Sequence, residues 1–333
     1  MDRRTAPCTA PETGYLWLNY MTDSMTVQLL RHMHAHCQDA DIRDIQLQVR
    51  QLAEERLTRT AKLLEDEQAA LPNGFTQQDV NVNAPRLFSD DFTLLLLYHM
   101  TNRSLVVCAK ALAMVVQPGV HDYFTACMRD TVEIGTRTKA HLLSKGLLSA
   151  PPFLHASAGA RPEQRESFLQ GYFGRGRTMN ALEIANAFHN IQMNTVVRTV
   201  MLGYAQTAQL PEVRKLLAKA VHRTKDEAEA FRKKLEEEQL SVTPLSDSFV
   251  TDSKEPPYTD KLMMFHASLV NGSSIEQYGF GMASSIRSDL GAAYEKMMSS
   301  ILHFADDGAR LMIDRRWLEM MPSAADRREL QKV

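Results

Sequence analysis

The chain has 333 residues, 44% of them hydrophobic, which is enough for about two domains with packed cores. Its 38 basic and 40 acidic residues nearly balance, so no nucleic-acid or membrane partner is expected. Residues 1–10 contain no apolar stretch, and polar residues interrupt the longest apolar segment, 94–116, so neither a secretory signal nor a membrane span is expected. Four cysteines without a Cys-x-x-Cys pair predict free thiols in a reducing, cytoplasmic compartment.

The sequence repeats itself after 170 or 171 residues. Glu12 and Glu183, which are 171 residues apart, each stand in the first turn of an expected amphipathic helix. Phe88-Ser89-Asp90 returns as Tyr258-Thr259-Asp260 at an offset of 170. Such self-similarity predicts two copies of one structural unit.

Each half is expected to contain four long helices. The first helix of each half begins at a capping box, Thr9-x-x-Glu12 or Asn180-x-x-Glu183, in which the glutamate bonds back to the helix N-terminus. We therefore interpret these glutamates as caps and not as catalytic acids. Most methionines, Met114 and Met282 among them, fall at helical core spacings and are interpreted as core filling.

Connection lengths predict the topology. The first two helices of each half are joined by a few residues and form an antiparallel hairpin, and so do the last two. Polar stretches at about 72–88 and 241–258 separate the hairpins. A helix of about 28 residues is about 42 Å long, and about 17 extended residues span up to about 56 Å, so each stretch can run the length of a bundle. Two hairpins joined by one long crossover, between the second and third helices, make a ferritin-like four-helix bundle.

We thus predict an all-α protein of two tandem ferritin-like four-helix bundles. The first bundle covers residues 1–148, a linker with one short helix near 163–170 covers 149–178, and the second bundle covers 179–333. The linker ends in aromatic and basic residues, at 171–177, on which a nucleic-acid strand could stack. A docked linker is the preferred interpretation, because the chain as a whole is close to neutral.

A ferritin-like bundle raises the question of a two-metal site. Such a site needs a carboxylate from each of two helices and a Glu-x-x-His from each of the other two. No expected helix contains Glu-x-x-His, and the helix at 92–117 and the one after Glu183 contain no acidic residue. We therefore assign no catalytic, cofactor-binding or metal-binding residue and expect no cofactor.

Histidine ligands are the alternative. His32 and His36 share one helix face and could chelate an ion, but Gly203 and Thr207 stand at the equivalent positions of the second half. A divergent metal-dependent enzyme would need several of five histidines to converge within about 2.1 Å of one zinc-type ion. These are His32, His36, His99, His121 and His141. A third possibility is a small-molecule-binding bundle with an apolar pocket of several hundred Å³.

Strings along the whole chain resemble one family. They are Asp79-Val-Asn-Val-Asn-Ala-Pro-Arg-Leu-Phe-Ser-Asp90, Ser144-Lys-Gly-Leu147, Asn190-Ile-Gln-Met-Asn194, Thr251-Asp-Ser253 and Thr259-Asp-Lys-Leu-Met-Met-Phe-His266. In these residues the chain resembles an uncharacterised family of tandem ferritin-like four-helix-bundle proteins from spore-forming bacteria, sometimes labelled "putative spore coat proteins". The resemblance implies the same fold and an association with the spore, and it carries over no active site.

Together these observations predict a non-enzymatic structural or interaction protein, cytoplasmic and spore-associated, that binds protein partners or self-associates. Because the duplication copies caps, helices and crossovers, the halves are expected to pack as a pseudo-symmetric pair, like a fused dimer.

Overall fold

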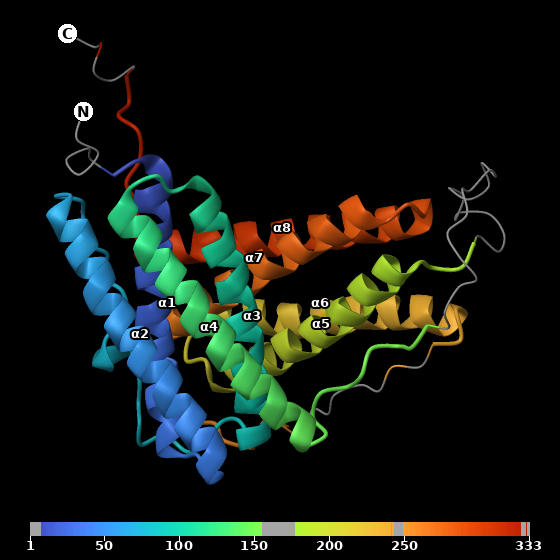
Figure 1. Cartoon of the computed structure of the whole chain (residues 1–333). Helices are drawn as coiled ribbons and strands as arrows, with labels where there is room; N and C mark the ends of the chain where they lie inside the picture. Colours follow the sequence, from blue (N-terminus) through green and yellow to red (C-terminus); the bar gives the residue numbers. More distant parts are fainter. Residues whose placement is uncertain (1–7, 155–176, 241, 243–248, 328–330, 332–333) are drawn as a thin grey trace.

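The computed structural model describes residues 8–154, 177–240, 242, 249–327 and 331, and all regular structure in these ranges is helical. Figure 1 shows the long helices in two groups whose long directions cross. The first group is α1 (Ala10–Ala35), α2 (Ala40–Asp66), α3 (Asp90–Met114) and α4 (Pro118–Ser144). The second group is α5 (Ala181–Thr207), α6 (Pro211–Glu237), α7 (Asp260–Ser284) and α8 (Ser288–Asp314). The predicted all-α fold of two four-helix units is confirmed, whereas the helix predicted near 163–170 lies outside the described residues.

Each group forms a four-sided bundle. α1 packs on α2 and α3, and α4 packs on the same two helices. In the second repeat α5 and α8 each pack on α6 and α7. Short turns close the hairpins, and long crossover loops, residues 67–89 and 238–259, connect them. The first crossover loop contains a 3-10 turn, η1 (Gln77–Asp79).

Glu12 and Glu183 tie the two hairpins of each bundle together. Each completes the predicted capping box at the start of its helix. Each also accepts two backbone hydrogen bonds from the turn of the other hairpin. Glu12 accepts from the amides of residues 116 and 117, at 2.9 and 2.6 Å. Glu183 accepts from the amides of residues 286 and 287, at 3.0 and 3.2 Å. Burial opposes ionisation, but the accepted hydrogen bonds lower the pKa of both carboxyls, so both are charged at neutral pH.

Asp90 and Asp260 complete this arrangement from the other hairpin. Asp90, at the start of α3, accepts hydrogen bonds of 2.8 and 2.9 Å from two amides of the α1–α2 turn. Asp260, at the start of α7, accepts bonds of 3.0 and 2.7 Å from the α5–α6 turn. Each bundle is thus closed by two carboxylates, each of which begins one hairpin and binds the turn of the other.

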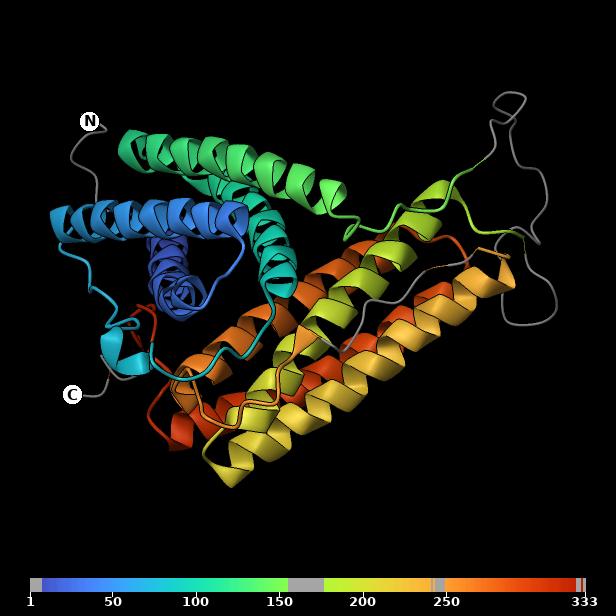
Figure 2. The same ribbon diagram turned by 90° about the horizontal axis from the view of Figure 1, so that it is seen from below.

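The two repeats pack about a pseudo-twofold axis. Their crossover loops lie side by side (Figure 2) and form backbone hydrogen bonds in equivalent pairs. In the first pair, the amide of Asn81 donates to the carbonyl of Pro257 at 2.8 Å, and the amide of Thr251 donates to the carbonyl of Leu87 at 2.9 Å. In the second pair, Thr259 donates to Asp79 at 3.1 Å, and Ser89 donates to Phe249 at 2.9 Å. One hydrophobic cluster contains side chains of both repeats, such as Leu95, Val200 and Met263. The predicted pseudo-symmetric pairing is confirmed.

Two details differ from the sequence-based expectations. Among the described helices, α3 is the one that is long and apolar enough to cross a membrane, and half of its apolar window is buried inside the protein. Met114 and Met282 are 46% and 42% exposed. Their interpretation as core residues is wrong, because both lie in the last turn of a helix, where packing against the bundle ends.

Gly203 allows a close approach between α5 and the first crossover loop. A Cβ atom on Gly203 would lie 2.6 Å from the ring of Phe88. At the equivalent place in the other repeat His32 packs edge-on against Tyr258, with ring centroids 5.6 Å apart. The histidine that the second repeat lacks is therefore part of a different packing against the equivalent loop of the other repeat.

Gly203→Ala is expected to destabilise the protein by about 1–3 kcal/mol, because Phe88 is buried and has little room to move. Gly272→Ala is the control, since nothing lies within 4 Å of the added methyl group, and this change within a helix should add about 0.5–1 kcal/mol. Urea unfolding of both variants measures the difference. Equal midpoints would contradict the close packing at Gly203.

Candidate functional site

A cavity of about 110 Å³ lies where the core of the first bundle meets α5 and α7. It can hold a few water molecules or one small organic molecule, and is smaller than the predicted pocket of several hundred Å³. Part of its wall is apolar and includes Leu96, Leu97, Val196, Val197, Leu269 and Val270. The rest is polar and includes Thr22, Asp23, Arg56, His99, Arg103 and Thr131.

Asp23 is the buried acid of this cavity. Its carboxylate accepts a hydrogen bond of 2.9 Å from the side-chain amide of Asn19, which also contacts the hydroxyl of Tyr123. Burial raises the pKa of Asp23 to about 7, although the positive charge of Arg56 lowers it. The carboxyl therefore takes up a proton at a higher pH than an exposed aspartate does.

Arg56 reaches across the bundle from α2 to α4. Its guanidinium donates to the carbonyl of Cys127 and the hydroxyl of Thr131, at 2.9 and 3.0 Å. Its Nε atom has no hydrogen-bond partner in the described structure, and the same holds for Oγ1 of Thr22 and Nδ1 of His99. A buried polar atom without a partner costs about 1–3 kcal/mol, so these atoms gain free energy when a polar group enters the cavity.

His99 and Arg103 project from successive turns of α3. Burial, helped by the nearby His189, lowers the pKa of His99 to about 3, so its ring is neutral. The Nε of Arg103 donates to the hydroxyl of Ser273, at 3.0 Å. These two residues are equivalent by the 170-residue offset, which places this bond at the pseudo-twofold axis. Burial lowers the pKa of Arg103, and no carboxylate of the described chain offsets that effect.

Larger side chains occupy the equivalent place in the second bundle. Arg223, Tyr278 and Phe304 stand where the first repeat has a leucine, a cysteine and an isoleucine. The Tyr278 hydroxyl lies 3.0 Å from the carboxylate of Glu227, and Arg223 forms an ion pair of 3.5 Å with the same carboxylate. The Arg223 guanidinium also lies over the ring of Phe304. Burial raises the pKa of Glu227 to about 7.

Each bundle therefore holds one carboxyl and one arginine at its centre, but the two repeats place these residues on different helices. Asp23 on α1 faces Arg56 on α2 in the first bundle. At the corresponding positions the second bundle has Asn194 and Glu227, so the acid has moved to the neighbouring helix. The tyrosine hydroxyl joins Asn194, whose amide donates to it at 2.7 Å, to Glu227.

Sequence reasoning did not single out Asp23, Arg56 or Arg103. A signal for Asp23 was present: it lies three residues after Tyr20 and four before Val27, on the apolar side of the first helix. No comparable signal marks Arg103, because its importance depends on the packing of the second repeat against α3.

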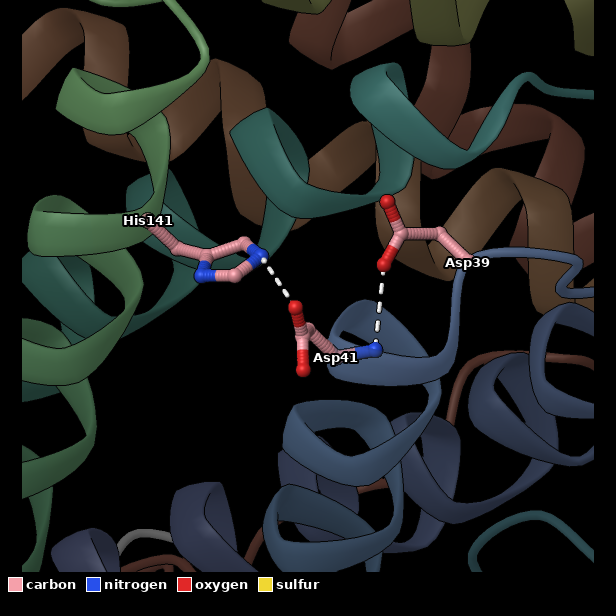
Figure 3. Close-up of side chains that lie close together, drawn as sticks. All are labelled: Asp39, Asp41 and His141. Atoms are coloured by element: carbon pink, nitrogen blue, oxygen red, sulfur yellow. Dashed lines mark hydrogen bonds and ion pairs between the residues drawn. The ribbon is translucent and has the colours of Figure 1, made fainter.

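Asp39, Asp41 and His141 form the one group of three potential metal ligands found among the described residues (Figure 3). Their nearest ligand atoms lie within 4.8 Å of one another. Asp39 caps α2, however, accepting from two of its amides, and binds the ammonium group of Lys145 at 2.7 Å. His141 lies 3.7 Å from the largely exposed Asp41.

The second repeat shows what this group does. Glu212 and Arg315, which stand where the first repeat has Asp41 and Lys145, form an ion pair there. Both repeats thus link the start of their second helix to the end of their fourth by opposite charges, and in the first repeat a lysine already supplies the cation.

The five histidines proposed as metal ligands lie in different places. His32 and His36 are neighbours with ring centroids 4.7 Å apart, but their Nε2 atoms bond to backbone carbonyls of the first crossover loop at 3.0 and 2.9 Å. His99 lines the cavity, His121 is exposed on α4, and His141 faces Asp41. Within the described ranges no three of these rings share one metal-binding geometry.

The predicted aromatic and basic segment at 171–177 lies outside the described residues except for its last member. Arg177 donates two hydrogen bonds of 2.8 Å to the carboxylate of Glu183, and so reinforces the cap of α5. All four cysteines are free, as predicted.

Asp23→Asn is expected to change how stability depends on pH. A carboxyl whose pKa is higher in the folded protein supports stability fully below about pH 4, and this support is lost as the pH rises to about 7. The rise in the pKa of Asp23 corresponds to a change of at most about 4 kcal/mol in the free energy of unfolding. The variant places at position 23 an asparagine, which is the residue that the second repeat has at the equivalent position, 194. It should be more stable than the natural protein at pH 8, and this gain in stability should shrink towards pH 5.

Urea unfolding of both proteins from pH 5 to pH 8 measures this difference, in which the buried histidines cancel because both proteins contain them. Asp122→Asn, which removes an exposed acid of α4, is the control. A stability difference between Asp23→Asn and the natural protein that stays constant with pH would contradict the raised pKa.

The comparison with protein-family models agrees with the duplication. A family model described as "Protein of unknown function (DUF3231)" matches residues 1–158 and again residues 167–330. A crystal structure described as that of a "putative spore coat protein" from Bacillus halodurans C-125 is similar with 20% identity and a TM-score of 0.42, over 47% of this chain and 100% of that chain. No curated protein matches. The chain belongs to the DUF3231 family, whose function is unknown, and contains the family's domain twice.

Proposed function

We propose that the chain is a non-enzymatic structural or interaction protein whose two repeats are ferritin-like bundles joined as a fused dimer. Two observations support the ferritin-like part: the order in which the helices neighbour one another, and the crossover between the second and third helices of each repeat. The predicted bundle limits, 1–148 and 179–333, belong to this proposal.

The centre of each bundle carries the functional part of the proposal. A ferritin-like metal centre needs four carboxylates and two histidines that face one another. Here the first bundle has Asp23 opposite Arg56, and the second has Glu227 beside Arg223. A buried guanidinium repels a metal cation and binds the carboxylate that would hold it. These charges fit a packing role better than a catalytic one.

The remaining buried acids have structural partners. Glu12, Glu183 and Asp260 bind helix N-termini or turns through their carboxylates. The same groups occur in both repeats, so they belong to the scaffold that the duplication copied. The histidine-dependent enzyme remains the alternative, and the separated rings described above count against it.

Elemental analysis tests this proposal directly. The protein, purified without a histidine tag and dialysed against a metal-free buffer, is expected to contain far less than one transition-metal ion per chain by inductively coupled plasma mass spectrometry. A stoichiometric metal would contradict the proposal. In that case Asp39→Asn and His32→Gln would show which group of ligands holds the ion.

Spore association and a cytoplasmic location are part of the same proposal and rest on the sequence resemblance. We expect the protein to be made in the cytoplasm of a sporulating cell and to be enriched in the spore coat extract. Immunoblots of vegetative cytoplasm, mother-cell cytoplasm and coat extract would measure this. Detection in vegetative cells alone would contradict the proposed spore association, but it would not contradict the proposed structural role.

A further inference from the structure

We propose that the cavity between the repeats binds a small organic monocarboxylate. The carboxylate pairs with Arg103, and the aliphatic tail lies against the apolar wall that α5 and α7 provide. This site goes beyond the proposed structural role and does not depend on it.

Charge is the first argument. Arg103 is partly buried, and its single hydrogen bond in the described structure goes to the neutral hydroxyl of Ser273. A buried cation without an anionic partner is costly, and a carboxylate matches the two-pronged geometry of a guanidinium. The other charges of the cavity are already opposed: Asp23 by Arg56, and Asp130 by Arg129, at 3.6 Å.

The lining is the second argument. His99, which is 8% exposed, has an unpartnered Nδ1 atom, and the hydroxyl of Thr22 also lacks a partner. Both residues line the same space as Arg103. The lining also includes valine and leucine side chains such as Val197 and Leu269. A lining that is largely apolar with a few polar groups is typical of small-ligand pockets.

Size limits the ligand. A dry cavity of about 150 Å³ accommodates benzene, which has six non-hydrogen atoms. The cavity here measures about 110 Å³, so the ligand should have about six non-hydrogen atoms or fewer. Butyrate meets this limit, and butyramide has the same shape without the charge.

The second repeat predicts the stoichiometry. There Arg223 already has an internal carboxylate in Glu227 and a second partner in the side-chain oxygen of Asn271. Tyr278 and Phe304 fill space that cysteine and isoleucine leave open in the first repeat. The chain should therefore bind one carboxylate and not two.

Isothermal titration calorimetry with acetate, butyrate, hexanoate and butyramide, supported by ligand-observed NMR, tests the site on the full chain. We expect saturable binding of butyrate at one molecule per chain and at least tenfold weaker binding of butyramide. Absence of saturable binding for all three carboxylates, equal affinity for butyrate and butyramide, or two sites per chain would each overturn the proposal.

Two variants locate the site. Arg103→Gln should weaken butyrate binding at least tenfold, leave butyramide binding unchanged and leave the melting temperature the same or higher, because the buried cation has no carboxylate partner to lose. Ile134→Phe copies Phe304 into the cavity and should abolish binding of both compounds in a protein that circular dichroism shows to be folded.

Lys110→Gln is the matched control. Lys110 forms an ion pair with Glu276 between the same two repeats, but it is half exposed and does not line the cavity. Its removal should not change butyrate affinity. Unchanged affinity in Arg103→Gln, or an equal loss in Lys110→Gln, would show that butyrate binds elsewhere. If a cavity variant does not fold, the comparison of butyrate with butyramide on the natural protein still decides the question.

Discussion

The backbone pairing between the two crossover loops is the contact on which the rest of the structure depends. Each loop must travel the length of a bundle, and a loop that long leaves many backbone amides and carbonyls without partners. Among the described residues, the two loops supply some of those partners to one another, through four bonds related by the pseudo-twofold axis. A single repeat would leave both the loop edge and the apolar face around Val200 and Leu95 uncovered, so the duplication stabilises each half.

Within each bundle, buried acids are used to fix the relation of the two hairpins. Glu12 and Asp90 each begin one hairpin and bind the turn of the other, and Glu183 and Asp260 do the same in the second repeat. A charged acceptor bound to backbone amides is stronger than a neutral one, and the two ends of the bundle are held in register. These acids are thus committed to the fold.

Local signals predicted much of this fold, and distant contacts limited the prediction. Caps such as Thr9 and Ser89 form from residues three or four apart, so the helix starts could be predicted accurately. The second role of Glu12 could not be predicted, because the amides that it binds are 104 and 105 residues away. The role of Arg103 could not be predicted for the same reason, because α7, which contacts it, is distant in the sequence. The reason why Gly203 stands in the place of His32 could not be predicted either, because it is the ring of Phe88, distant in the sequence, that packs against Gly203.

The two bundle centres show how a duplicated scaffold can divide its tasks. In the second repeat the tyrosine donates to the acid, the arginine forms an ion pair with it, and aromatic rings fill the remaining space, although Nε and Nη1 of Arg223 and one carboxylate oxygen of Glu227 have no hydrogen-bond partner in the described structure. In the first repeat smaller side chains leave a cavity, and the hydroxyl of Thr22 and the ring of His99 keep atoms without partners. Unpartnered buried atoms lower the stability of both repeats, and the hydrophobic cluster that the two repeats share offsets this cost. The open cavity next to α5 and α7 is therefore a consequence of the same docking that closes the crossover loops.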